Sequence, residues 1–136
     1  MSEYSMLING EAVSADSAID VINPATEEPI ASVPAASSEQ LDMAVAAARA
    51  ALPAWSARSM DERRELILKM ADRIEQNMGE LAQLLSQEQG KPMEGFAGLG
   101  AMFELGGCLA WIRYTASLDL PVEVIQDNDE ARIEVH

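Results

Sequence analysis

The spacing of hydrophobic and polar positions changes along the chain, and each spacing predicts a different kind of element. Residues 6–34 hold short alternating segments that turn at Asn9-Gly10 and are bounded by prolines, which predicts short strands. Between residues 37 and 90 the apolar positions recur every third or fourth residue, which predicts three amphipathic helices. The first helix is expected to end near Pro53, because proline disfavours helical backbone in the residue before it.

Polar residues and a glycine mark the ends of these helices. Ser37 with Gln40, and Ser59 with Glu62, have the spacing of a capping box, in which each residue satisfies a backbone N–H group of the other. The third helix is expected to end at Gly90, since glycine readily takes the left-handed conformation that closes helices.

Residues 93–118 are apolar almost all round, which predicts one long apolar helix. Each glycine inside a helix costs about 1 kcal/mol relative to alanine, so close packing is expected to compensate for those found here. The glycines of this segment are Gly95, Gly98, Gly100, Gly106 and Gly107. The three upstream helices are expected to cover only part of its surface.

The last residues predict a β-hairpin. The alternating segments 123–125 and 132–135 flank a polar turn, and such a hairpin on its own is marginally stable and leaves an unpaired edge. The whole pattern predicts an α+β, mostly helical fold. We divide it into the strands and helices of residues 1–121 and the start of the hairpin at 122–136.

Charge and composition narrow the range of partners. The chain has 136 residues, and 9 basic against 23 acidic groups give a net charge of −14, which would repel nucleic acid and anionic membranes. No apolar run reaches the roughly 18 residues of a membrane span, and the N-terminus lacks the features of a signal peptide. The single cysteine, Cys108, allows no internal disulfide, so a cytoplasmic location is expected.

Candidate chemistry is sparse. Cys108 lies in the apolar segment without a nearby base, and the only histidine is His136, so we expect a buried and inert thiol. One cysteine and one histidine cannot make a zinc site. The glycine-rich residues 98–107 do not follow a strand, as a dinucleotide-binding turn would require. The sequence therefore predicts no catalytic and no cofactor-binding residues in this chain.

Several segments, in order and spacing, resemble the start of the NAD(P)-dependent aldehyde dehydrogenases. They include "LINGEAV", "DVINPATEEPIASVPAAS" and "ERRELILKMADRIEQNMGELAQLLSQEQGKP", and the most specific pieces are "INPAT" at 22–26 and "GKP" at 90–92. The resemblance covers essentially the whole chain and implies the N-terminal part of a longer enzyme. That parent would oxidise an aldehyde to a carboxylic acid through a thiohemiacetal and hydride transfer to NAD or NADP.

The resemblance also implies roles for parts of this chain. The catalytic groups and the cofactor turn would lie downstream, so the chain alone is expected to be inactive and to need no cofactor. Its hairpin would join an oligomerisation subdomain, which makes other copies of the same protein its partners. A structural cation would lie near Val21, Ile22 and Glu88, where Val21 replaces a side chain that is often a hydroxyl.

Two questions stay open, and each has two possible answers. The resemblance places Gly106 and Gly107 at the mouth of the aldehyde tunnel, where glycine would admit a bulky or aromatic aldehyde, whereas close helix packing would explain the same glycines. The second question concerns the chain as a whole. It could be a free-standing helical protein-interaction module instead of part of an enzyme, with its apolar helix and edge hairpin as partner surfaces. Continuation of the native reading frame beyond His136 would separate the module from the enzyme part.

Overall fold

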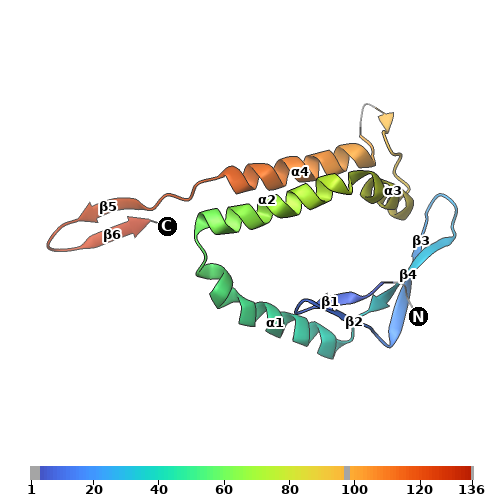
Figure 1. The fold of residues 1–136 in the computed structure, drawn as a ribbon, viewed down its shortest axis with the longest axis horizontal. Helices are drawn as coiled ribbons and strands as arrows, with labels where there is room; N and C mark the ends of the chain where they lie inside the picture. The colour runs from blue at the N-terminus through green and yellow to red at the C-terminus, as the bar shows by residue number, and fades with distance from the viewer. Residues whose placement is uncertain (1–3, 97–98, 136) are drawn as a thin grey trace.

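Four helices and three two-stranded hairpins form the described part of the chain, residues 4–96 and 99–135 of a computed structural model (Figure 1). In chain order the elements are β1 (Met6–Ile8), β2 (Glu11–Val13), β3 (Ser17–Ile22), β4 (Pro29–Ala35), α1 (Ser38–Ser56), α2 (Met60–Gln76), α3 (Met78–Gln89), α4 (Ala101–Ser117), β5 (Glu123–Asp127) and β6 (Arg132–Val135). The predicted mixture of short strands and helices is confirmed. None of the described helices is long and apolar enough to cross a membrane.

Each strand of the described residues pairs with its sequence neighbour, antiparallel, and the three hairpins do not join into one sheet. The predicted turn of the first hairpin is confirmed, with Asn9 at φ 53° and Gly10 at φ 80°. These left-handed values suit asparagine and glycine, which favour the tight turns of hairpins. The β3–β4 hairpin has a register shift between Val21 and Ile22, just before the turn that holds the "NPAT" sequence.

Both predicted capping boxes are present. Ser37 Oγ accepts from the backbone N–H of Gln40 at 3.2 Å, and Ser59 Oγ accepts from that of Glu62 at 3.2 Å, with the reciprocal side-chain bonds also formed. The predicted end of α1 near Pro53 is wrong, because the helix continues to Ser56. No residue of α1 is buried, so the carbonyl that loses its partner to Pro53 can bond to water.

The predicted long helix is too long at its N-terminal end, because α4 begins at Ala101 rather than near residue 93. Gly95 has φ 64°, a left-handed value that breaks a helix. The backbone N–H groups of Ala101 and Met102 donate to the carbonyls of Pro92 and Met93 at 2.9 and 3.1 Å. Residues 92 and 93 are therefore bonded to the first turn of α4 and do not belong to that helix, and Gly98 lies outside the described residues.

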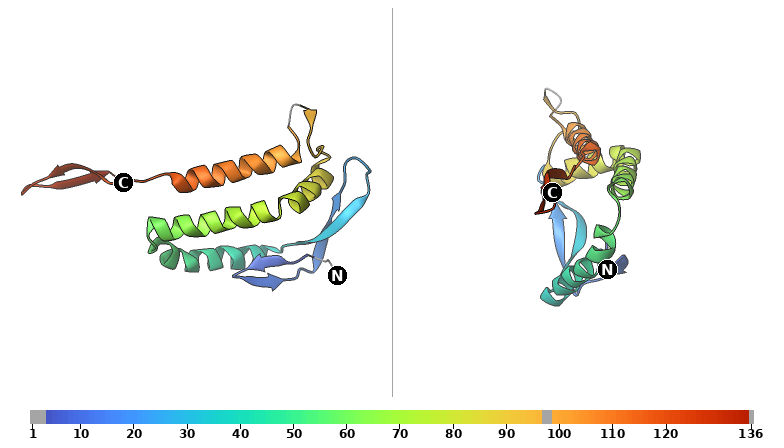
Figure 2. Two further views of the ribbon diagram at one scale, coloured as in Figure 1. Left: turned by 45° about the horizontal axis from the view of Figure 1, so that its top comes forward. Right: turned by 90° about the vertical axis from the view of Figure 1, so that its left-hand side faces the viewer.

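α4 lies alongside α2 and runs in the opposite direction, with α3 near one end (Figures 1 and 2). The buried residues of these helices are mostly small: Ala71, Ala82, Ala101, Leu109 and Ala116. Small side chains let the helices approach closely, so the interface is tight but narrow. The other side of α4 stays open, with Phe103, Trp111 and Tyr114 exposed.

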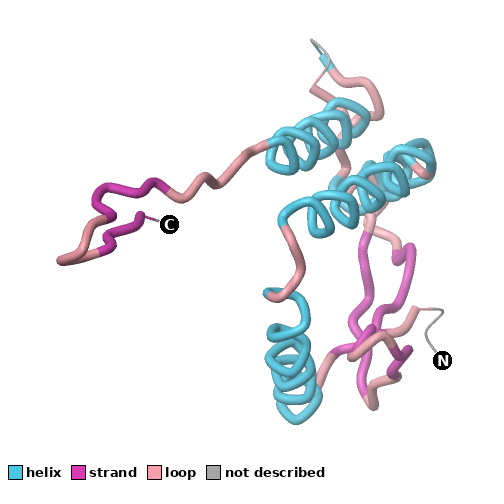
Figure 3. The backbone as a smooth tube through the Cα atoms, turned by 60° about the vertical axis from the view of Figure 1, so that its left-hand side comes forward, coloured by secondary structure: helices cyan, strands magenta, loops and turns pink. Residues whose placement is uncertain are grey.

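The C-terminal hairpin formed by β5 and β6 confirms the predicted strands. It follows an extended linker, residues 118–122, and lies away from the helices (Figures 1 and 3). α1 likewise lies apart from α4 and contacts β1. In the described residues α2, α3 and α4 thus pack together, whereas α1 and the three hairpins lie outside this group.

Candidate functional site

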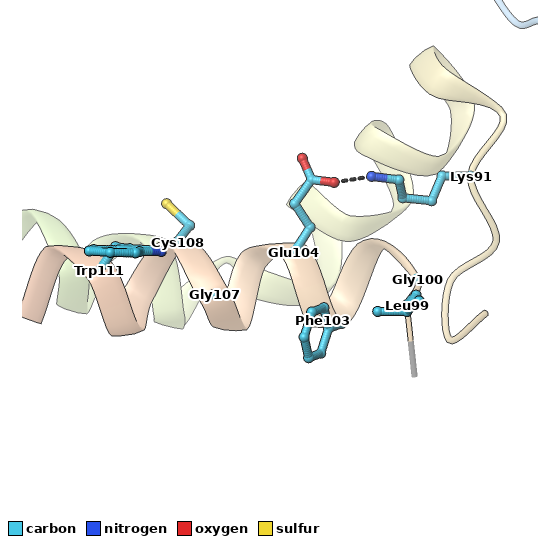
Figure 4. A pocket seen from close by; sticks show the side chains of 8 residues that line it. All are labelled: Lys91, Leu99, Gly100, Phe103, Glu104, Gly107, Cys108 and Trp111. Atoms are coloured by element: carbon cyan, nitrogen blue, oxygen red, sulfur yellow. Dashed lines mark hydrogen bonds and ion pairs between the residues drawn. The ribbon is translucent and has the colours of Figure 1, made fainter. Parts of the chain in front are cut away.

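A hollow on the open side of α4 contains two of the candidate residues, Gly107 and Cys108 (Figure 4). The loop before α4 and the first three turns of that helix form it. Its lining residues are Lys91, Leu99, Gly100, Phe103, Glu104, Gly107, Cys108 and Trp111. Lys91 Nζ forms an ion pair with the Glu104 carboxylate across one edge, and most of the remaining lining is apolar.

The two glycines predicted for the tunnel mouth lie on different sides of α4. A Cβ atom placed on Gly106 would lie 4.0 Å from Met78 Cε of α3, an ordinary contact distance. A Cβ atom on Gly107, which lines the hollow, would meet nothing within 4 Å. Packing within the described residues therefore does not require glycine at either position. This weakens the explanation by close helix packing, and most strongly for Gly107.

Cys108 is exposed, so the prediction of a buried thiol is wrong. Only one side of α4 packs against α2 and α3, as expected from partial cover by the upstream helices, and Cys108 lies in the hollow on the uncovered side. In the part of the chain that the structure describes, no hydrogen bond or ion pair reaches the thiol, and the cation of the hollow is bound to Glu104. Exposure alone does not make Cys108 a nucleophile, because activation needs a base or a free positive charge.

The predicted cation ligands lie on two neighbouring segments. Ile22 ends β3, Glu88 is exposed in the last turn of α3, and the turn after β3 contacts the end of α3 through Pro24 and Gly90. Ile22 offers only its backbone carbonyl, and Glu88 one carboxylate. Residues 4–96 and 99–135 contain no group of three His, Cys, Asp or Glu that could hold a metal ion. A hard cation takes about six or more oxygens, so these two residues do not make a site by themselves.

Ion pairs that the sequence analysis missed join α4 to α2. Arg113 Nη2 lies 2.5 Å from Glu75 Oε2 and 3.7 Å from Asp72 Oδ1. The hydrogen bond from Arg113 holds the pKa of Glu75 below its ordinary value, and the same bond raises the pKa of Arg113. Arg113 and Glu75 are 38 residues apart in the sequence, so no local sequence pattern predicts their ion pair.

Known proteins resemble the chain in sequence and in structure. Aldehyde dehydrogenase LUC3 of a Fusarium species is 37% identical over 130 residues, which cover 96% of this chain and 27% of that protein. The solved structure of PnpE in complex with nicotinamide adenine dinucleotide has a TM-score of 0.81 at 37% identity, over 93% of this chain and 26% of that one. NADP-dependent glyceraldehyde-3-phosphate dehydrogenase from Bacillus halodurans, complexed with NADP, has a TM-score of 0.84 at 29% identity, over 94% of this chain and 26% of that one.

The chain spans about a quarter of the length of the curated relatives it matches. The sequence model of the aldehyde dehydrogenase family matches residues 12–131, which is most of the chain and includes both the "NPAT" and "GKP" sequences. The resemblance predicted from those sequences is confirmed, and the chain belongs to the aldehyde dehydrogenase family.

Proposed function

We propose that the chain forms the N-terminal part of an enzyme that oxidises an aldehyde to a carboxylic acid with NAD or NADP. The observation that carries the proposal is the family match over residues 12–131. Similar solved structures that include an NAD and an NADP complex support the nicotinamide cofactor. In this proposal the chain contributes scaffold, one side of the aldehyde entrance and subunit contacts, and no catalytic residue.

Activity measurements test this proposal. The 136-residue chain should give no aldehyde-dependent reduction of NAD or NADP, whereas the product of the native reading frame, continued beyond His136, should give both reduced cofactor and carboxylic acid. Turnover by the 136-residue chain that Cys108→Ser abolishes would show that Cys108 is catalytic after all. A native stop codon directly after His136 would instead support the free-standing interaction module, which the family match does not favour.

Gly107 is the position at which we propose that the chain limits the size of the aldehyde. Glycine lowers helix stability at this position, and packing within the described residues does not require it. Gly107 lines the hollow together with Phe103 and Trp111. In the longer enzyme, Gly107→Leu should lower kcat/KM for bulky aldehydes and spare small ones. Gly106→Ala is the matched control, because that side of α4 faces Met78. Equal losses for all aldehyde sizes in Gly107→Leu would contradict the assignment.

The remaining parts of the proposal concern the setting of the longer enzyme. The hairpin within residues 122–136 would contact other subunits of a homo-oligomer, since β5 and β6 form a two-stranded sheet in the described residues and a strand of another copy could extend it. The Ile22 carbonyl and the Glu88 carboxylate would contribute two oxygens to a structural cation whose other ligands lie outside this chain. A cytoplasmic location is supported by the single cysteine, because disulfides are rare in that compartment.

A further inference from the structure

Arg64 of α2 contacts the C-terminal end of α4 and the linker that follows it. Its Nε donates to the carbonyl of Ala116 at 2.6 Å, and its Nη2 donates to that of Leu118 at 3.4 Å. Nη2 also lies 2.9 Å from the carboxylate of Asp119, and Nη1 lies 2.6 Å from that of Asp61. One guanidinium therefore joins the first turns of α2, the last turn of α4 and the start of the linker.

The end of α4 needs such a contact from outside. The last carbonyls of a helix have no partner within it, and they carry the negative end of the helix dipole. α4 has no basic residue in its last turn that could compensate. Arg64 provides both the donors and the positive charge, and its side chain is only 28% exposed. The bond to Asp61, one helical turn earlier on α2, holds the guanidinium in place from the opposite side.

The linker is the only covalent path from the helices to the C-terminal hairpin among the described residues. Residues 118–122 are extended, and Figures 1 and 3 show the hairpin projecting from the end of α4. The direction of the first linker residues therefore decides where the hairpin lies. Arg64 binds Leu118 and Asp119, which are these first residues.

We propose that Arg64 is a positioning residue that fixes the direction in which the linker leaves α4, and thereby where the β5–β6 hairpin is presented. A planar guanidinium suits this role, because it binds several acceptors in fixed directions. The proposal does not depend on what the hairpin binds. It concerns the conformation of this chain and stands whether or not the longer protein oxidises aldehydes.

A distance measurement between two spin labels tests the proposal. The exposed Cys108 carries one label, and Asp129→Cys in the turn of the hairpin carries the other. An excess of unlabelled chain keeps the measured pairs within one molecule. The parent chain should give a single narrow distance distribution. Arg64→Met, which keeps a long side chain but removes all donors, should broaden the distribution and remove its single peak.

Two further variants separate positioning from folding. Lys69→Met makes the same change of charge on the exposed side of α2 and should leave the distribution narrow. Asp119→Asn weakens only the ion pair between Arg64 and the linker. It should broaden the distance distribution without loss of helical circular dichroism. This variant therefore tests the proposal even if Arg64→Met fails to fold. A broad distribution in the parent, or an unchanged one in Asp119→Asn, would overturn the proposal.

Discussion

Gly90 is the first residue of the "GKP" sequence, and it lies against Pro24 of the "INPAT" sequence. It closes α3 with φ 68°, and a Cβ atom built on it would lie 2.8 Å from Pro24 Cγ. Pro24 itself belongs to a turn in which Asn23 accepts the backbone N–H of Ala25 with its side chain and that of Glu27 with its carbonyl. The "NPAT" turn is thus seated on the end of α3, and the close approach requires glycine.

Gly90→Ala is expected to destabilise the end of α3 by about 1–2 kcal/mol. The left-handed backbone is unfavourable for alanine, and its methyl group would overlap Pro24. Gly79→Ala is the matched control. Gly79 lies inside α3, where a Cβ atom meets nothing within 4 Å, so the change should stabilise the helix by about 0.5–1 kcal/mol. Hydrogen exchange of the α3 amides measures both effects. If both variants change the stability of α3 in the same direction, Pro24 does not constrain Gly90.

At the scale of elements, the two capping boxes differ in one chemical respect. The box of α1 uses the neutral Gln40, and that of α2 uses the ionisable Glu62. The backbone hydrogen bond from Ser59 lowers the pKa of Glu62 below the ordinary 4.5, and the Ser59 side chain adds to this. A lowered pKa in the folded chain means that the stabilisation is present above pH 4.5 and is lost as the pH falls through the lower folded value.

Glu62→Gln should therefore reduce the loss of helix stability on acidification while it keeps the capping box, as Gln40 does in α1. Thermal unfolding followed by circular dichroism, from neutral pH to well below the pKa of glutamate, measures the effect. Glu65→Gln removes a carboxylate from the exposed surface of the same helix and serves as the control. If both variants have the same acid dependence, the Ser59 bonds do not contribute to it.

The sequence predicted elements well where their signals are local. The capping boxes, the Asn9-Gly10 turn and the left-handed Gly90 depend on residues three or fewer positions apart, and all are confirmed. The start of α4 was mispredicted because it depends on the positive φ of Gly95 and on bonds back to Pro92, which apolar periodicity does not reveal.

The candidate site shows the same limit. Cys108 was expected to be buried because its segment is apolar, but the surfaces that would cover the open side of α4 are absent from the described residues. The role of Arg64 was not foreseen, since its partners at the end of α4 lie more than 50 residues away. The one signal that could have suggested it is the lack of a basic residue in the last turn of α4.

As a whole molecule, the chain exposes far more surface than a compact protein of its mass. Its accessible area is 10488 Å², against about 6900 Å² for a compact monomer of 14.7 kDa. Large apolar side chains on α1, α4 and the C-terminal hairpin contribute to the excess. At about 25 cal/mol per Å², burial of about 600 Å² of this surface would contribute on the order of 15 kcal/mol, which can exceed association costs of roughly 4–15 kcal/mol.

The chain in isolation is therefore expected to form a dimer or a larger assembly. Repulsion from the net charge of −14 opposes this, but salt screens it beyond about 8 Å at physiological ionic strength. Light scattering at micromolar concentration measures the state. Ile133→Pro removes a backbone donor from β6 and should weaken the assembly, whereas Ile133→Val keeps the donor and should not. A strictly monomeric parent chain would contradict the prediction.

The separate hairpins have a consequence for the rate of folding. Each hairpin closes within its own stretch of sequence, as does each helix, and such local steps take microseconds or less. Docking α4 on α2 must instead close a long loop, and its entropic cost comes before the contacts of Leu109 and Ala116 form. Truncating Leu109 to alanine should therefore slow refolding in stopped-flow experiments, whereas truncating Ile8 in β1 should mainly speed unfolding.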